Sequence, residues 1–522
     1  MPVLKLENVT KRFGALVAND AISLSLKAGE VLALLGENGA GKTTLMNILF
    51  GHYVADEGAI EIDGKALPAG STEAAIEAGV GMVHQHFTLA DNLTVLENIV
   101  LGTESLWSWR HDNKSARAKL EKMAADFGLM VEADKLVGEL SVGERQRVEI
   151  LKVLYRDAHV LILDEPTAVL TPQESESLFK TLASLTARGL AVIFISHKLH
   201  EIMTIADRVA VLRRGRLVGE VATRDADQAL LAEMMVGRKV TRPRLVAMAA
   251  GEPVLKMTGV TVAGRTGVPS LDRVDLTVRA HEIVGIAGVS GNGQRTLADV
   301  LSGLVQPSSG TLELFGEPLG ATTPSDMVRR GVGRIPEDRQ AAGVIGDMAI
   351  WENLISEDIR TDAVSNWGIV IDKPSAIARA DRQIDEFDVR CEGAMAETKL
   401  LSGGNMQKLI LARALSPAPS FILANQPVRG LDEGAIAYVQ GRLLDARERG
   451  AGILLISEDL DELQALADRI AVIYHARLSE PFTTGSKTVP EIGLMMAGQF
   501  GEVGGNGGAR SREKAEAPVH AD

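Results

Sequence analysis

The sequence predicts an α/β protein that consists of two tandem copies of one module. The segment VLKLENVT at Val3–Thr10 returns as VLKMTGVT at Val254–Thr261, and IADRVAVLRRGRL, which begins at Ile205, returns as LADRIAVIYHARL from Leu466. The two displacements are nearly equal across a whole half, which indicates domain duplication. Apolar runs such as VLALLG at Val31–Gly36 are followed by segments with helical spacing, a pattern typical of buried parallel strands that alternate with helices.

Composition narrows the class of protein. The chain has 522 residues, 46% of them apolar and 24% charged, which is typical of folded protein with room for about two to four domains. No apolar stretch reaches the roughly 18 residues of a membrane span and no export signal is evident, so we expect a protein that starts in the cytoplasm. The net charge of −14 argues against a dedicated nucleic-acid binder. The single cysteine, Cys391, excludes an internal disulfide framework and is predicted to be a buried small apolar residue.

The repeat and the local composition set the expected domain boundaries. We expect a first domain at residues 1–236, a linker at 237–252 that is basic and then rich in small residues, and a second domain at 253–500. Residues 501–522 are rich in glycine and charge and are predicted to be disordered.

The elements of the first half lead to a phosphate-binding loop. The segments LKLENVT and SLSLKAG alternate apolar and polar residues, as half-exposed strands do, whereas VLALLG is predicted to be a buried strand. The loop GENGAGKTT at Gly36–Thr44 follows that strand and opens a segment with helical spacing. Its glycines let backbone N–H groups converge on an anion at a helix N-terminus. Lys42 would reach the β and γ phosphates of a nucleotide, and the Thr43 hydroxyl would coordinate Mg²⁺.

Two further apolar runs end in chemistry-bearing side chains. HVLILDEP ends at Asp164 and Glu165, and LAVIFISHKL contains His197 just after its apolar part. Ligands of open α/β sheets bind at the carboxyl ends of the strands. Asp164 is therefore predicted to be a magnesium partner and Glu165 the acid that polarises an attacking water. The alternative is that the two acids only cap a helix.

The order of these motifs, with Gln85 and then LSVGERQRVEI from Leu140 ahead of Asp164, resembles the ATP-binding cassette family over nearly the whole chain. The resemblance implies two P-loop NTPase domains, each a RecA-like core with an antiparallel β subdomain and a helical subdomain. It implies that ATP lies between the Walker motifs of one cassette and the LSGGQ-like signature of the other. It also implies that His197 senses the γ-phosphate, that Gln85 contacts Mg²⁺ and the attacking water, and that Phe13 stacks on adenine. Phe13 fits an ordinary core or edge position just as readily.

The second half has lost the residues that the chemistry requires. Asn425 stands against Asp164 and Gln426 against Glu165, so amides of similar shape replace both carboxylates. The other matching positions carry Gln294 for Lys42, Arg295 for Thr43, Glu337 for Gln85, Glu458 for His197 and Gly264 for Phe13. The second set of Walker motifs is therefore predicted not to hydrolyse ATP.

The signature segments show the opposite bias. The second half reads LSGGN at Leu401–Asn405 and supplies Asp432 in VRGLDEG, whereas the first half has Val142 and Thr171 at the matching places. All intact parts therefore fall in one composite pocket. The residues expected to bind nucleotide are Phe13, Gly36, Glu37, Asn38, Gly39, Ala40, Gly41, Lys42, Thr43 and Thr44 of the first half and Ser402, Gly403, Gly404, Asn405 and Asp432 of the second. Glu165, His197 and Gln85 are the expected catalytic residues, with Thr43, Gln85 and Asp164 around Mg²⁺.

Two fused cassettes without a membrane span resemble the ATPase subunit of bacterial importers of simple sugars and nucleosides. The segments EPTAVLTPQE from Glu165, GRIPEDR from Gly333 and ANQPVRGLD from Ala424 favour the nucleoside branch, with simple sugars as the alternative. The resemblance implies two membrane permeases, an extracytoplasmic solute-binding protein and a place at the cytoplasmic face of the membrane. FTLADNLTVLENI and GVIGDMAIWENLI would line the permease-binding grooves or pack within the helical subdomains. A tandem-cassette ATPase that acts on ribosomes or DNA is the rival interpretation.

Overall fold

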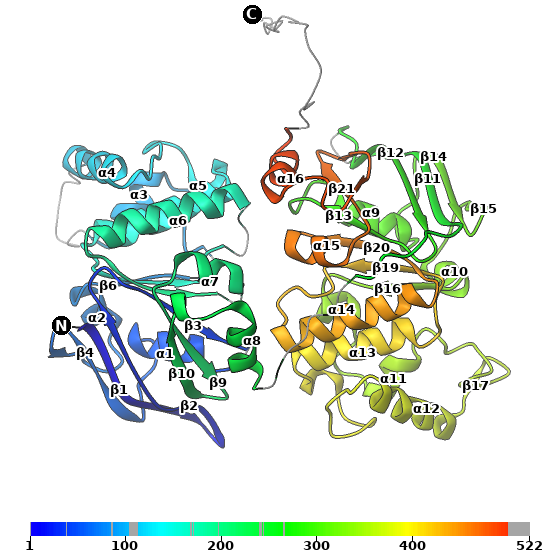
Figure 1. Cartoon of the computed structure of the whole chain (residues 1–522), viewed down its shortest axis with the longest axis horizontal. Coiled ribbons are helices and arrows are strands. Elements are labelled where there is room, and N and C mark those ends of the chain that lie inside the picture. The colour runs from blue at the N-terminus through cyan, green and yellow to red at the C-terminus, as the bar shows by residue number, and fades with distance from the viewer. Residues whose placement is uncertain are drawn as a thin grey trace, which may run out of the picture.

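The computed structural model describes residues 2–37, 39–84, 87–103, 113–167, 170, 172–196, 198–237, 239, 243, 245–264 and 267–499. The predicted α/β fold class is confirmed: each half contains a four-stranded antiparallel sheet and a largely parallel sheet that helices cover, and the second half has a further short two-stranded sheet. The two halves lie side by side in Figure 1.

The first half contains the elements up to Val236. Its strands are β1 (Pro2–Phe13), β2 (Leu16–Lys27), β3 (Val31–Gly36), β4 (Glu57–Ile62), β5 (Lys65–Ala66), β6 (Val80–Val83), β7 (Val160–Asp164), β8 (Ala191–Ile195), β9 (Arg208–Arg213) and β10 (Arg216–Ala222). Its helices are α1 (Lys42–Leu49), α2 (Thr72–Glu77), α3 (Val95–Val100), α4 (Asn113–Phe127), α5 (Val142–Tyr155), α6 (Pro172–Ala187), α7 (Leu199–Ile205) and α8 (Gln228–Val236).

The second half repeats the series. Its strands are β11 (Pro253–Val262), β12 (Leu271–Arg279), β13 (Ile283–Ala287), β14 (Ser309–Leu314), β15 (Glu317–Pro318), β16 (Val332–Ile335), β17 (Ser365–Asn366), β18 (Val370–Ile371), β19 (Phe421–Asn425), β20 (Gly452–Ser457), β21 (Arg469–Tyr474), β22 (Arg477–Leu478) and β23 (Phe482–Thr483). Its helices are α9 (Gln294–Leu301), α10 (Pro324–Arg329), α11 (Ile350–Ile355), α12 (Lys373–Glu386), α13 (Gly403–Leu415), α14 (Glu433–Glu448), α15 (Leu460–Leu466) and α16 (Val489–Met496).

The large sheets of the two halves have the same strand order. The first runs β10-β9-β3-β8-β7-β6, and the second runs β22-β21-β13-β20-β19-β16, with β23 added beside β21. Strands β3, β7 and β8 are buried along their whole length and pair in parallel. Their carboxyl ends therefore lie at one edge of the sheet, where the phosphate loop, Asp164 and the segment after β8 all begin.

Helices from both halves meet in the middle of the molecule (Figure 1). Helix α8 contacts α14, and α6 contacts α16. The side-chain amide of Gln173 on α6 donates a hydrogen bond to the carbonyl of Pro490 on α16, at 3.2 Å. The halves are thus joined by direct contacts as well as by the connecting segment.

One expectation from the sequence needs correction. Cys391 is only partly buried, because it lies at the margin of the second helical core.

The structure also decides between the two alternatives for FTLADNLTVLENI at three of its apolar positions. Val95, Leu96 and Ile99 pack within the helical subdomain, in the core that α3 forms with α5 and its neighbours. Ile350 and Trp351 of the matching segment are buried in the same way. A short amphipathic helix buries its apolar face against its own subdomain first.

Within the part of the chain that the structure describes, no helix is both long and apolar enough to cross a membrane.

A buried carboxyl group in the second half gives a pH-dependent stability. Glu462 on α15 is 3% exposed and accepts a hydrogen bond from the Ser457 hydroxyl at 2.6 Å. Its other oxygen, Oε1, has no hydrogen-bond partner among the described residues. Burial raises the pKa of Glu462 from 4.5 to about 8. The folded state therefore holds this proton more tightly than the unfolded state does.

We predict that Glu462→Gln flattens the pH dependence of stability. In the wild type, stability should fall as pH rises from about 4.5 to about 8, because the folded chain must give up the proton from a buried site. The glutamine variant cannot titrate and should be the more stable of the two at the upper end of this range. Thermal unfolding of both proteins across that pH window measures the effect, and parallel curves would contradict the prediction.

Candidate functional site

The phosphate-loop backbone has the same shape in both halves. Gly39 and Gly41 have φ angles of 79° and 100°, and their counterparts Gly291 and Gly293 have 91° and 118°. Only glycine adopts this left-handed region without strain. A Cβ atom on Gly41 would also lie 2.3 Å from the carbonyl oxygen of Ala18. Each loop leads into a helix N-terminus, that of α1 or α9, so each half retains the cradle.

The charge within the cradle differs between the halves. Lys42 is 7% exposed, and its ammonium donates hydrogen bonds to the carbonyls of Gly36, at 2.6 Å, and Glu37, at 3.1 Å. Burial lowers the pKa of Lys42, and the nearby carboxylates of Glu165 and Asp164 oppose that effect. Gln294 takes the same place in the second half, equally buried, and its amide donates to Val289 at 2.8 Å. The geometry is preserved while the positive charge is absent.

At the strand ends, as in the phosphate loop, neutral side chains of similar shape in the second half replace charged ones in the first. Asp164 and Asn425 are both 8% exposed at the ends of β7 and β19. Glu165 and Gln426, which follow them, have φ angles of 48° and 51°. The N–H of Glu165 donates to Ile195 at 2.9 Å, and that of Gln426 donates to Ile456 at 2.8 Å. Burial and the adjacent Glu165 raise the pKa of Asp164, whereas Lys42 lowers it.

Phe13 lies where an aromatic base could stack on it. It ends β1, is 45% exposed, and contacts the ring of Tyr53 edge-on with centroids 5.6 Å apart. The counterpart Gly264 has no room for a side chain, because a Cβ atom there would lie 1.9 Å from the carbonyl oxygen of Val268. An aromatic platform is thus available in the first half and sterically excluded at the matching place in the second.

The two signature segments cap their helices differently. In the second half Ser402 caps α13, and the side-chain amide of Asn405 donates to the Ser402 hydroxyl at 3.0 Å. In the first half Glu144 accepts from the backbone N–H of Ser141 at 2.8 Å in a capping box. That hydrogen bond lowers the pKa of Glu144, so a carboxylate charge sits at the N-terminus of α5. A phosphate is repelled by that charge but not by the neutral Asn405.

Asp432 of the second half lies near the first phosphate loop. Burial raises the pKa of Glu37 in the first phosphate loop, and the next largest contribution comes from the carboxylate of Asp432 in the second half. Asp432 caps α14 and accepts from the N–H of Ala435 at 2.8 Å. An electrostatic contribution of this rank requires that Asp432 lies near the loop that carries Lys42.

Some charges of the second pocket are satisfied internally, whereas the side chain of Arg295 in its phosphate loop is 91% exposed and lies 4.0 Å from Asp299. Arg429 forms an ion pair with Glu337, and Arg339 donates to the carbonyl of Arg429. Burial raises the pKa of Glu458, and Arg429 opposes the rise. This pocket holds arginine–carboxylate contacts in place of the lysine and acids of the first pocket.

Three predicted site residues, Asn38, Gln85 and His197, lie outside the described part of the chain, as does Thr171, which stands at the place of Asp432 in the first half. The remaining first-half residues, Gly36, Glu37, Gly39, Ala40, Gly41, Lys42, Thr43, Thr44, Asp164 and Glu165, gather at the carboxyl edge of the first parallel sheet and the N-terminus of α1. Ser402, Gly403, Gly404 and Asn405 gather at the N-terminus of α13, and Asp432 at that of α14.

A model of the ABC transporter family matches residues 19–168 and 271–429. The chain belongs to this family. It is therefore a twin-cassette ABC ATPase, and each matched region spans one phosphate loop and one strand-end motif.

Curated relatives match the ABC chain over nearly its full length. The glucose import ATP-binding protein TsgD13 of Haloferax volcanii is 44% identical, over 98% of this chain and 98% of its own. The nucleoside import ATP-binding protein NupA of Lactococcus lactis is 42% identical, over 95% and 98%. The guanosine import ATP-binding protein NupO of Bacillus subtilis is 42% identical, over 95% and 97%.

One solved structure resembles both cassettes together. An archaeal ribosome recycling factor, in complex with the ribosomal stalk protein aP1, aligns with a TM-score of 0.60 and 19% identity over 91% of this chain and 90% of its own. At that identity the likeness concerns the fold alone.

Sequence reasoning missed one set of buried contacts behind the catalytic strand ends. The hydroxyl of Thr167 donates to the carboxylate of Glu201 at 2.6 Å, and the hydroxyl of Ser196 donates to it at 3.0 Å. Comparison of the two halves of the sequence could have drawn attention to Thr167, because the second half carries Val428 at that place.

We predict that Phe13→Ala raises the KM for ATP about tenfold and leaves kcat nearly unchanged. Stacking of a base on an aromatic ring contributes about 1–3 kcal/mol, and the ring lies away from the reacting phosphates. Steady-state ATPase kinetics measure the two constants. Phe315→Ala, which removes a comparably exposed ring of the second half, is the control and should change neither. An unchanged KM for Phe13→Ala would assign the adenine platform to another side chain.

Proposed function

We propose that the chain hydrolyses ATP at one composite pocket and thereby drives the import of nucleosides. The first half supplies Lys42, Asp164, Glu165 and His197, and the second half supplies the LSGGN segment and Asp432. Each half lacks what the other keeps, which supports this assignment. The first half has the charged Walker residues but a carboxylate at the start of its signature helix. The second half has a neutral signature segment but lacks the lysine and the two acids of the Walker motifs. The influence of Asp432 on Glu37 supports the pairing across the halves.

Each residue has a defined task in this pocket. The Lys42 ammonium and the N-terminus of α1 bind the β and γ phosphates of ATP. Glu165 accepts the proton of the attacking water, Phe13 holds the adenine, and Ser402 with the N-terminus of α13 binds the γ-phosphate from the opposite side. Closure of the halves on ATP and their separation after phosphate release would provide the mechanical stroke.

The donor set also suits Mg²⁺. The Thr43 hydroxyl is exposed at the start of α1, and the carboxylate of Asp164 lies at the end of β7. Hydroxyl and carboxylate oxygens are the ligands that Mg²⁺ prefers, and a cation there would favour the ionised form of Asp164, whose pKa burial raises. Gln85 would complete the set. When bound, the ion would neutralise charge on the phosphate oxygens.

We expect Glu165→Gln to lower the ATPase rate at least about a hundredfold while ATP still binds, because a general base contributes about 10²–10⁴-fold. Gln426→Glu is the matched variant in the second half. It should create no second active pocket, since Gln294 and Asn425 would remain neutral. Phosphate release and ATP binding by equilibrium dialysis check both. If Glu165→Gln kept more than about a hundredth of the rate, another group would be the base.

The transport assignment rests on the motifs and on the relatives. EPTAVLTPQE, GRIPEDR and ANQPVRGLD favour the nucleoside branch, and two of the relatives are named for the import of nucleosides or guanosine. TsgD13 is named for glucose, so a simple sugar is the alternative cargo. In either case the partners are two membrane permeases and an extracytoplasmic solute-binding protein, with the chain held at the cytoplasmic face of the membrane by the permeases.

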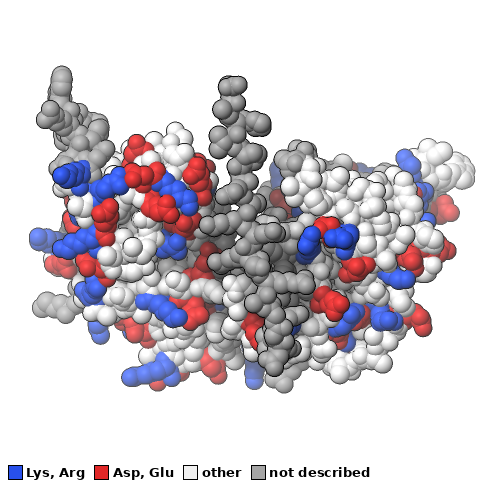
Figure 2. Space-filling view, turned by 90° about the horizontal axis from the view of Figure 1, so that it is seen from above, with Lys and Arg blue, Asp and Glu red and all other residues white. Residues whose placement is uncertain are grey.

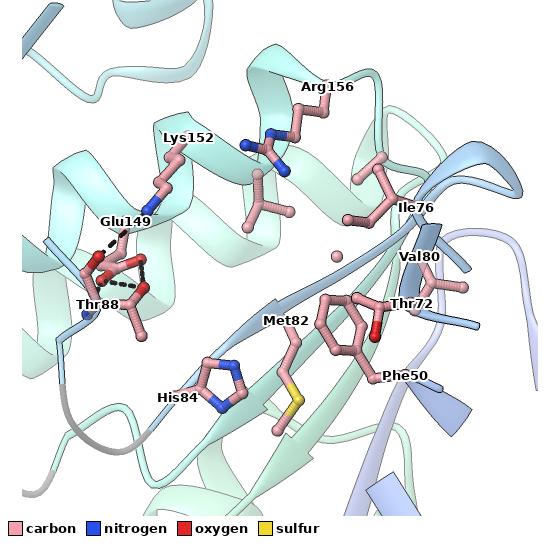
Figure 3. Close-up of a pocket in the computed structure, with 13 residues that line it drawn as sticks. Phe50, Thr72, Ile76, Val80, Met82, His84, Thr88, Glu149, Lys152 and Arg156 are labelled. Atoms are coloured by element: carbon pink, nitrogen blue, oxygen red, sulfur yellow. Dashed lines mark hydrogen bonds between the residues drawn. The ribbon is translucent and has the colours of Figure 1, made fainter. Parts of the chain in front are cut away.

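A groove in the first half suits a permease helix. A cavity of about 250 Å³ opens between β6 and α5, beside the segment that carries Gln85. Figure 3 shows Phe50, Met82 and His84 on one side of it, with Lys152 of α5 and Arg156, which follows that helix, on the other. The floor is apolar, and the rim carries these two cations together with Glu149, which accepts hydrogen bonds from Thr88. An amphipathic helix with a carboxylate at its edge fits this combination.

We predict that Lys152→Glu weakens permease binding by at least about fivefold and leaves the ATPase rate of the isolated chain within about twofold. Lys152 lines the groove and is only partly buried, so the change reverses a charge at the rim without placing a charge in the core. Pull-down of permeases from detergent extracts measures the effect, and Lys152→Arg is the control. Normal recovery of the permeases would place their docking elsewhere.

The rival function on ribosomes or DNA has less support. On the face that Figure 2 shows, lysine and arginine side chains are interspersed with aspartate and glutamate, rather than gathered in a basic patch. Purification of the full chain from its native membranes decides between the two. Recovery with two apolar permeases, and nucleoside uptake that depends on Glu165, is expected; recovery with ribosomes would overturn the proposal.

A further inference from the structure

Glu201 is a buried carboxylate that joins the two strand ends of the first pocket. It lies on α7 and is 6% exposed. Its Oε2 accepts from the hydroxyl of Thr167 at 2.6 Å and from that of Ser196 at 3.0 Å, and the ammonium of Lys198 lies 3.4 Å from its Oε1. Thr167 and Ser196 are each 2% exposed, so water does not compete for these bonds.

The donors come from the two segments that carry the predicted catalytic side chains. Thr167 stands two residues after Glu165, and Ser196 and Lys198 flank His197 in the sequence. One further bond, from the N–H of Glu165 to the carbonyl of Ile195, connects the same two segments. The carboxylate of Glu201 is thus the point where the segment after β7 and the segment after β8 are tied together.

The second half keeps only part of this arrangement. Ser457 still donates to Glu462, and the N–H of Gln426 still donates to Ile456. However, Val428 replaces Thr167 and Asp459 replaces Lys198, so the carboxyl group has lost one hydroxyl donor and its cationic partner. Glu462 Oε1 has no hydrogen-bond partner in the described part of the chain.

Comparison of the two halves shows which of these contacts the fold requires and which it does not. The strand order and the left-handed turn after the strand are the same in both halves, so neither the Thr167 bond nor the Lys198 pair is needed to form them. The serine bond, present in both halves, is part of the common fold. The two contacts that differ were lost in the half that also lost its catalytic charges.

We propose that Glu201 is a positioning residue for ATP hydrolysis, which holds Glu165 in register with the segment of His197 through Thr167, Ser196 and Lys198. The proposal rests on the proposed composite pocket. The left-handed turn at Glu165 also forms in the second half, where these contacts are missing, so their task is to limit the motion of the turn and not to create it. A buried, charge-assisted bond two residues from Glu165 supplies such a restraint. Because Glu201 is 6% exposed, it would act through these neighbours and not by direct contact with nucleotide.

The test replaces Thr167 by the residue that the second half carries. Thr167→Val has nearly the same shape and removes only the hydroxyl donor. We expect kcat for ATP to fall about tenfold with the KM within about twofold of the wild type, because misplacement of a catalytic group affects the reaction more than binding. Thr167→Ser keeps the donor and should restore most of the rate. A role in packing alone would leave serine no better than valine.

The matched control is Glu462→Gln, which alters the corresponding carboxyl of the second half and should leave kcat unchanged. Glu201→Gln, which keeps the shape but removes the charge, should lower kcat as Thr167→Val does and serves if the valine variant does not fold. An unchanged kcat in Thr167→Val would overturn the proposal. If the valine variant does not fold, an unchanged kcat in Glu201→Gln has the same meaning. An equal loss of kcat in Glu462→Gln would also overturn it. Glu165→Gln in the same assay separates the two proposals: if it is active, the composite pocket itself is wrongly assigned.

Discussion

The first pocket depends on a buried group of opposite charges. Lys42, Asp164 and Glu165 lie close enough that each acid opposes the loss of the lysine proton, which burial favours. A buried charge is tolerated only beside its partners, because removal of one partner leaves the others desolvated without compensation. The second half has a neutral residue at all three places, Gln294, Asn425 and Gln426. Loss of Lys42 alone would leave two acids without their cation, and loss of both acids alone would leave a buried cation without an acid, so neutral residues at all three places satisfy the constraint.

The constraint also explains why the backbone of the inactive pocket is so little changed. The phosphate loop, the strand order and the left-handed turn were kept because the surrounding core fixes them, and amides fill the volumes of the former acids. The shape of the pocket is thus a property of the fold, whereas its activity is a property of a few charges. A cassette of this kind can lose hydrolysis without loss of the surface that its partner half requires.

Much of this was accessible from the sequence. The repeat, the glycine loop and the acids at strand ends predicted the α/β fold and the first-half residues that gather at one sheet edge, because these signals are local and tied to strand ends. The segment FTLADNLTVLENI was harder, since periodicity identifies an apolar face but not the surface that covers it; Val95, Leu96 and Ile99 turned out to face their own core. The Thr167–Glu201 contact joins residues distant in sequence, so only the comparison of Thr167 with Val428 could have indicated it.

The asymmetry has a consequence for how the two halves act together. In the first pocket Lys42 lies beside two acids, and its ammonium is the cation available to the phosphates of a nucleotide. In the second, Arg429 is already paired with Glu337, while Arg295 of the phosphate loop has a side chain that is 91% exposed and lies 4.0 Å from Asp299. Lys198 of the first half opposes the pKa rise of Glu458, so the interior of the second pocket is also influenced from across the interface. A charged group that is already paired within the protein gains little electrostatic free energy when a nucleotide binds. A charged group that is free to contact the phosphates gains more. In the proposed composite pocket, most of the electrostatic free energy of ATP binding would therefore arise on the side of the interface where Asp432 lies near the first phosphate loop.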